Sequence, residues 1–218
     1  MRYPRPITPI TPIRRSARIL GTLTLGLALT LTACGNDEPV NDGSTQVSET
    51  DHNDADVAFA TDVIQHHAQA LSMVDLTVDR TLDPEVQQLA DDIREAQGPE
   101  IETMSDWLQE WDEEIPATMR DHSNAGHDMD GMGDSMDGLD SDMPGMMSGD
   151  DFDELENAPD SEFQTMWLEM MVEHHEGAVE MAQEEQDNGQ YKPAVDLAGA
   201  VVETQSAEID KMKTLLGS

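Results

Sequence analysis

The sequence predicts an all-α protein, a four-helix bundle built from two repeated antiparallel helix hairpins with a long flexible crossover between them. An internal repeat and apolar residues spaced three and four positions apart along four segments carry this prediction. The alternating patterns typical of strands are nearly absent. A single hairpin leaves its apolar face in water, whereas two hairpins packed back to back bury both faces.

The repeat has a constant offset of 108 residues. The motif His-His-x-x-Ala-x-x-Met starts at His66 and again at His174, and the motif Gln-x-x-Glu-Ile-x-x-Met starts at Gln97 and again at Gln205. Both motifs recur in the same order at the same separation, so the chain consists of one helical unit used twice.

Four long helices are expected, two in each hairpin. The first hairpin occupies residues 54–115 and the second residues 151–218. Asp54 or Asp56 can cap the first helix, and Asp83 followed by Pro84 is a typical helix start. The expected helices are 54–79, 84–111, 161–188 and 193–216.

The segment between the hairpins, residues 116–150, is rich in Gly, Asp, Ser, Met and His. It lacks the periodic large apolar residues that a core element needs, so we expect a mobile crossover that the bundle does not need for folding. A short helix capped by Ser148 can follow it. The exposed side chains expected to capture metal weakly are His122, His127, Met129, Met132, Met136, Met143, Met146 and Met147.

Residues 1–33 have the pattern of a bacterial lipoprotein signal peptide: a basic start, an apolar stretch, and Leu-Thr-Ala before Cys34. We therefore expect cleavage before Cys34, a lipid anchor on its sulfur, and a position on the extracytoplasmic side of the cell membrane. Residues 34–53 are polar and aperiodic, which predicts a flexible tether.

The composition excludes several classes of protein. A net charge of −36 repels nucleic acid and attracts cations. The single cysteine excludes an intrachain disulfide framework and a thiolate metal cluster. No nucleotide-binding loop or Ser-His-Asp pattern is present, and no organic cofactor is expected.

The repeated histidines and methionines are the candidate metal ligands. Imidazoles combined with soft thioethers suit copper, Cu(I) in particular, and a nearby carboxylate can either bind the ion or orient a histidine. Binding is expected to weaken below about pH 6, since an imidazolium cannot coordinate a metal. The rival hypothesis is that these side chains only pack. The candidates are His66, His67, Met73, Glu100, Met104, Met170, Met171, His174, His175, Met181, Glu208 and Met212.

These motifs resemble the domain of unknown function 305 family, whose pattern is Met-x-x-His-His-x-x-Ala-x-x-Met-Ala followed by Gln-x-x-Glu-Ile-x-x-Met. The second repeat fits closely from Met171 to Ala182, whereas the first has Val63 and Val74 at the matching places. The resemblance implies a ferritin-like helical fold, export to the cell envelope, and copper binding in some members.

The preferred hypothesis is an envelope-anchored protein that binds or buffers copper. One alternative is a ferritin-like metal oxidase, although that fold usually builds its centre from glutamates and Glu-x-x-His motifs, and the first helix has no such motif. Another is a helical interaction module with structural histidines. Metal stoichiometry separates the last from the first two, and oxygen consumption separates binding from oxidation.

Cys34 provides the first test. Mass spectrometry of the native protein should find a chain that starts at Cys34 with a diacylglycerol on the sulfur, because two acyl chains anchor a protein stably. A Cys34→Ala variant should leave the membrane fraction. A free thiol in the native protein, or a membrane-bound variant, would contradict the expectation.

Overall fold

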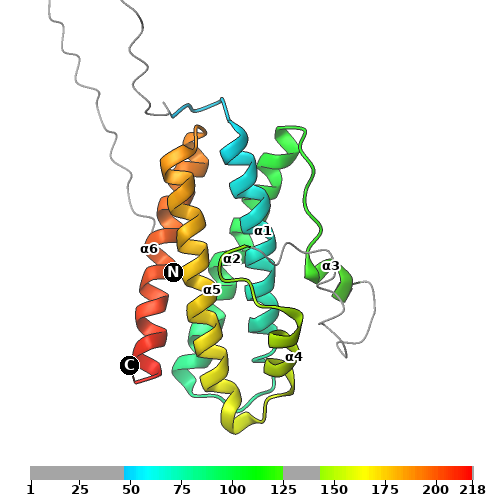
Figure 1. The fold of residues 1–218 in the computed structure, drawn as a ribbon, viewed down its shortest axis with the longest axis vertical. Helices are drawn as coiled ribbons and strands as arrows, with labels where there is room; N and C mark the ends of the chain where they lie inside the picture. The colour runs from blue at the N-terminus through cyan, green and yellow to red at the C-terminus, as the bar shows by residue number, and fades with distance from the viewer. Residues whose placement is uncertain (1–46, 125–142, 218) are drawn as a thin grey trace, which may run out of the picture. The chain divides into compact units, whose positions relative to one another are not determined.

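The computed structural model describes residues 47–124 and 143–217, and every element longer than a single bridge in this part of the chain is a helix (Figure 1). The all-α class predicted from the sequence is confirmed. None of the described helices is long and apolar enough to cross a membrane. The long helices are α1 (Asp54–Asp75), α2 (Pro84–Glu110), α5 (Asp160–Asn188) and α6 (Lys192–Leu215), and the short ones are α3 (Met119–Asn124) and α4 (Gly149–Asn157).

The helix boundaries follow local signals in the sequence, with two corrections. Asn53 is the N-cap of α1, and Asp56 closes the capping box from the third position, whereas the sequence suggested Asp54 or Asp56 as the cap. Helix α1 ends at Asp75 and not at residue 79, since the chain turns there and Asp79 has φ of 65°. Asp83 caps α2 as expected.

The long helices form two hairpins that pack through α1 and α5 (Figure 1). Helices α2 and α6 begin at residues 84 and 192, which are separated by the offset of the sequence repeat. Each sequence repeat therefore forms one helix hairpin. In each hairpin one helix (α1 or α5) makes the main contact with the other hairpin, and the second helix (α2 or α6) lies outside that contact.

The apolar core is divided into two parts by a polar layer. One core, here called the upper core because it includes the start of α1, contains Phe59 of α1 and Met104 of α2. The other, the lower core, contains Met73 of α1 and Trp167 of α5. On all four long helices the buried residues change from apolar to polar between these cores. The buried polar residues of this level are His66, His67, Gln97, His174, His175 and Gln205.

The ends of the crossover are packed, which corrects the expectation that residues 116–150 carry no anchor. Met119, Met143 and Met147 are buried, so the latter two cannot serve as exposed weak ligands. Arg120 pairs with Asp75 at 2.6 Å, and α4 adds two buried apolar side chains to the lower core. Buried apolar residues, this ion pair and the hydrogen bonds of Gln69 to Met147 hold these ends. His127, Met129, Met132, Met136 and Cys34 lie outside the described residues.

A buried carboxylate fastens the upper end of the bundle. Asp56 accepts hydrogen bonds from the backbone N–H groups of Asn53, Gln190 and Tyr191 at 2.6 to 3.0 Å. Ser48 joins the same turn through a parallel bridge, with its N–H on the carbonyl of Gln190 at 2.7 Å. These contacts tie the segment before α1 to the turn between α5 and α6.

Glu185 lies beside Asp56 and holds a proton. Its two carboxyl oxygens are buried, and no donor group lies at normal hydrogen-bond geometry from either of them. Burial, together with the neighbouring Asp56 carboxylate, raises the pKa of Glu185 to about 9. The folded state therefore keeps Glu185 neutral at pH values where the unfolded chain ionises it.

Replacing Glu185 with Gln should stabilise the protein above neutral pH. Between pH 4.5 and about 9 the unfolded chain releases the Glu185 proton and the folded chain retains it, so stability falls with rising pH, by at most about 1.4 kcal/mol per pH unit. Thermal unfolding of Glu185→Gln should match the wild type at pH 4 and exceed it at pH 8. The neighbouring exposed Glu184→Gln is the control, and equal midpoints for Glu185→Gln and the wild type at pH 8 would refute the assignment.

Candidate metal centre

Four imidazoles meet at the polar layer between the two cores. His66 and His67 lie next to each other on α1, and His174 and His175 lie next to each other on α5; all four are fully buried. The rings of His66 and His174 approach to 3.7 Å between centroids, and those of His174 and His175 to 6.3 Å. The structure therefore gathers every histidine that the repeat marked, two from each hairpin.

Each hairpin adds one carboxylate to this layer through its outer helix. Glu100 Oε2 lies 2.8 Å from His67 Nε2, and Glu208 Oε2 lies 2.9 Å from His175 Nε2. Both carboxylates keep partial access to solvent. The two pairs are equivalent under the repeat, so Glu100 and Glu208 act here as acceptors that orient a ring, one of the two roles that the sequence left open.

The acceptors select which nitrogen of each ring is free. A carboxylate or carbonyl oxygen cannot donate, so the ring nitrogen that it contacts carries the proton. His67 and His175 therefore hold their protons on Nε2, and so does His66, whose Nε2 donates to the Pro144 carbonyl at 3.0 Å. Their Nδ1 atoms are buried and have no hydrogen-bond partner, and in the neutral ring Nδ1 carries the lone pair.

His174 differs from the other three histidines. Neither of its ring nitrogens makes a hydrogen bond of normal geometry. Its ring contacts that of His66 and faces that of His175. A buried imidazole without a well-formed hydrogen bond is costly to fold, at about 1–3 kcal/mol for an unsatisfied group, unless a ligand meets it.

The layer keeps its central histidines neutral. Burial lowers the pKa of His66 from 6.5 to about 3, and the neighbouring His67 adds to this effect. Burial and the adjacent His66 also lower the pKa of His174 well below 6.5. The expected loss of coordination near pH 6 is therefore wrong for these two rings, since they stay uncharged in more acidic solution and keep their lone pairs.

The four histidine side chains would have to rearrange before they could coordinate one metal ion together. Among the described residues, no group of three or more His, Cys, Asp or Glu side chains has the arrangement of a metal site. Rotation of an imidazole, or recruitment of a thioether, would complete the coordination. Free Nδ1 atoms in an apolar surrounding favour a soft or borderline cation over Mg²⁺ or Ca²⁺, which require oxygen ligands.

The predicted methionines lie in the two cores and do not form a cluster of their own. Met73, Met171 and Met212 are fully buried in the lower core, and Met104 is fully buried in the upper core. Met170 is partly buried against the lower core. Their thioethers thus flank the histidine layer from both sides along the bundle axis.

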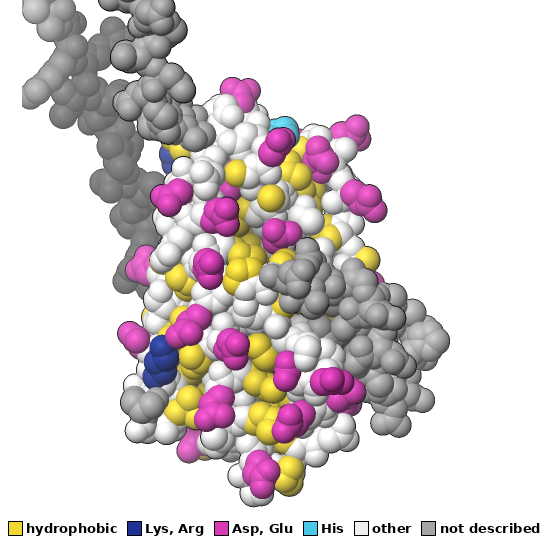
Figure 2. Space-filling model, in the orientation of Figure 1, with side chains coloured by type: hydrophobic (Ala, Val, Ile, Leu, Met, Phe, Trp, Pro, Cys, Tyr) yellow, Lys and Arg dark blue, Asp and Glu magenta, His cyan; other side chains and the backbone are white. Residues whose placement is uncertain are grey.

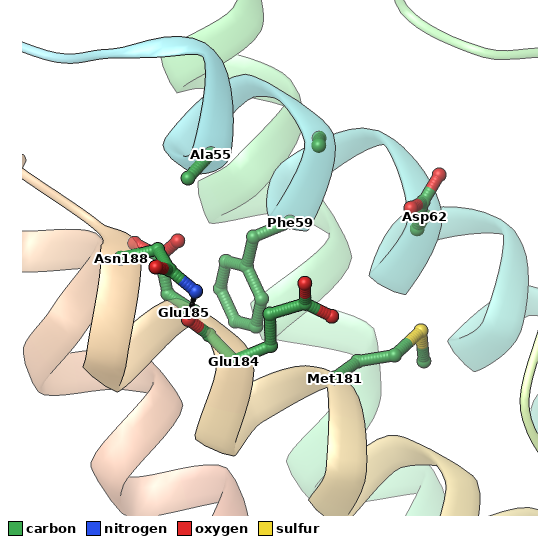
Figure 3. A pocket seen from close by; sticks show the side chains of 8 residues that line it. Ala55, Phe59, Asp62, Met181, Glu184, Glu185 and Asn188 are labelled. Carbon is green, nitrogen blue, oxygen red and sulfur yellow. Dashed lines mark hydrogen bonds between the residues drawn. The ribbon is translucent and has the colours of Figure 1, made fainter.

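Met181 lines a separate groove of about 400 Å³ between α1 and α5. Figure 3 shows Met181 and Glu184 on the α5 side of this groove, with Phe59 and Asp62 on the α1 side.

On the face drawn in Figure 2, acidic side chains are spread over the described surface and do not gather at one place. The acidity is thus general to this surface.

Sequence reasoning missed the contact of Pro144 with His66. The signal was a divergence within the repeat: Gln69 and Gly177 occupy equivalent positions three residues after His66 and His174. Gln69 binds the backbone of Met147 through both atoms of its amide, and Gly177 leaves room for Pro144. At this position of the repeat, the difference in side chain accompanies the docking of a third segment.

Comparison with known proteins places these features in a family. The family described as "Domain of unknown function (DUF305)" matches residues 56–216. The chain belongs to this family. A DUF305 structure from Streptomyces coelicolor has 31% identity and a TM-score of 0.61, over 75% of this chain and 92% of that one. A DUF305 fragment from Deinococcus radiodurans has 27% identity and a TM-score of 0.61, over 76% and 97%.

Structures of a protein called CopM are similar as well. Its Cu(I)-bound form has 26% identity and a TM-score of 0.55, over 73% of this chain and 94% of that one. CopM has also been solved in Cu(II)-bound, silver-bound and apo forms. A comparison with curated proteins gives no match.

The neutral histidines predict acid lability of the metal-free protein. Below pH 6.5 His66 and His174 become protonated in the unfolded chain but stay neutral in the folded chain. The free energy of unfolding therefore falls as the pH decreases. For His66 the loss between pH 7 and pH 5 is about 2 kcal/mol. Urea unfolding at both pH values should show a smaller loss in His66→Leu than in the wild type. His52→Leu, which leaves both rings in place, should keep the full loss; an unchanged loss in His66→Leu would disprove the assignment.

Proposed function

We propose that the protein binds copper, as Cu(I), at the histidine layer, and that it serves in the cell envelope as a copper-binding or copper-buffering protein. The observation that carries this proposal is the set of four buried imidazoles with Nδ1 atoms that have no hydrogen-bond partner. Three of these rings are held by acceptors on Nε2, the arrangement that orients a metal-binding histidine and raises its basicity.

The ligand chemistry supports copper over harder ions. Neutral imidazole suits copper, zinc and nickel, and thioethers add a preference for Cu(I). Met171 and Met73 are buried in the lower core, one turn before His174 and two turns after His66. Met171 is therefore the nearer of these two thioethers along its helix, about 4.5 Å in axial rise from the histidine of its own repeat.

Members of the same fold provide independent support. CopM, at 25–27% identity, has been crystallised with Cu(I), Cu(II) and silver. Silver and Cu(I) are both soft monovalent cations that select sulfur and imidazole ligands. The histidine layer offers this chain the imidazoles that such ions require.

The carboxylates favour binding over oxidase chemistry. Ferritin-like oxidases bridge two metals with glutamates that project into the bundle. Here Glu100 and Glu208 each accept from a histidine of the same hairpin and keep partial contact with water. They are placed as orienting groups, and the first hairpin has no Glu-x-x-His motif that could replace them.

Location in the envelope is part of the same proposal. The leader and Cys34 predict export and lipid attachment. A net charge of −36 creates a field that concentrates cations near the surface. A lipid-held acidic protein with a buried soft-metal site is suited to hold copper outside the cytoplasm.

Paired substitutions test the site directly. His66→Leu with His67→Leu, and His174→Leu with His175→Leu, should each weaken Cu(I) binding by at least about tenfold, since metal ligands are lost. The second pair should cost more, because His174 contacts rings from both helices. Calorimetric titration with Cu(I) against a competing chelator measures both affinities and the stoichiometry.

The control is His52→Leu, because His52 stacks on Trp111 and lies outside the layer. It should bind Cu(I) as the wild type does. Full affinity in both double variants would show that the histidines only pack. Oxygen uptake during Cu(I) loading would instead support the oxidase alternative.

A further inference from the structure

The end of the crossover crosses the histidine layer as a short strap, residues Met143–Met147. Its Pro144 carbonyl accepts from His66 Nε2 at 3.0 Å. Gln69 fixes the strap from below: its Nε2 donates to the Met147 carbonyl at 2.9 Å, and its Oε1 accepts from the Met147 N–H at 2.8 Å. Met143 and Met147 are buried by the same docking.

Glycines on both sides allow the strap to come this close. A Cβ at Gly177 would lie 2.0 Å from the Pro144 carbonyl oxygen, and one at Gly145 would lie 2.6 Å from the Glu173 carbonyl oxygen. Gly145 also has φ of 73°, which other residues rarely adopt. The backbone of the strap therefore touches the backbone of α5 directly at the level of His174.

The strap breaks the equivalence of the two hairpins. His66 and His174 occupy matching positions of the repeat, yet only His66 makes a hydrogen bond of normal geometry through Nε2. The position three residues further on is Gln69 in one repeat and Gly177 in the other. In the first repeat, Gln69 binds the strap through its side-chain amide. In the second repeat, the missing side chain of Gly177 leaves room for the strap.

We infer that the strap is part of the metal site, with Pro144 as a positioning residue for His66. Its carbonyl does for His66 what Glu100 does for His67 and Glu208 does for His175: it holds the proton on Nε2 and directs the Nδ1 lone pair to the ion. Gln69 and Gly177 act through Pro144. This inference rests on the proposed function, because it assigns the strap a role in the same site.

Gly177→Ala tests the inference without changing a histidine. The new methyl group meets the Pro144 carbonyl and pushes it away from His66, while alanine maintains α5. Gly98→Ala is the matched control, since a Cβ at this helical glycine meets nothing within 4 Å. Gln69→Leu releases the strap at Met147 by an independent route and covers the case in which Gly177→Ala does not fold.

Two measurements are made on the full chain. Long-range ¹H–¹⁵N correlation of the metal-free protein reports which nitrogen of His66 carries its proton, and titration with Cu(I) reports affinity. Gly177→Ala and Gln69→Leu should lose the fixed Nε2–H of His66 and bind Cu(I) about 10- to 100-fold more weakly. Gly98→Ala should match the wild type in both.

The outcomes separate this inference from the function on which it rests. If both variants lose the fixed proton and keep wild-type affinity, the strap only packs and the inference is wrong. If they keep the fixed proton, Pro144 does not position His66. If the wild type itself binds no Cu(I), the proposed function fails and the assignment of Pro144 to a metal site fails with it.

Discussion

The structure depends on one unfavourable burial: four imidazoles placed in the middle of a helical bundle with lone pairs that meet no donor. Burial of a polar group without a partner costs free energy, and the apolar cores above and below the layer offset that cost. The same burial keeps His66 and His174 neutral by lowering their pKa values. The layer is thus unfavourable for packing, and its buried nitrogens suit the soft cation that we propose.

Duplication explains how such a layer arises. Each hairpin brings two adjacent histidines and one orienting carboxylate, so packing α1 against α5 gathers four rings at one level. The repeats differ at many positions, and one of these differences, Gln69 against Gly177, lies where the crossover returns to the bundle. The symmetric part of the site comes from the repeat, and its asymmetric part comes from the segment that joins the repeats.

The repeated elements could be predicted from the sequence because their signals are local and periodic. Helix spacing, Asp83 and the His-His motif locate α2 and the histidines within a few residues. The strap could not be predicted, since Met143 and Met147 show no periodicity and their burial depends on a distant Gln69. The protonated nitrogen of each ring could not be predicted either, because the acceptors on Nε2 are known only once α2, α6 and the strap are packed.

The bridge between Ser48 and Tyr191 has a mechanical consequence. A pull on the chain ahead of Val47 meets the backbone hydrogen bonds from Ser48 to Gln190 and from Lys192 to Ser48, at 2.7 Å each, before it reaches α1. The force passes into the turn between α5 and α6 and is borne by both hairpins together. Because α1 is shielded from being peeled away turn by turn, the spacing of the imidazoles is insulated from tension at that end.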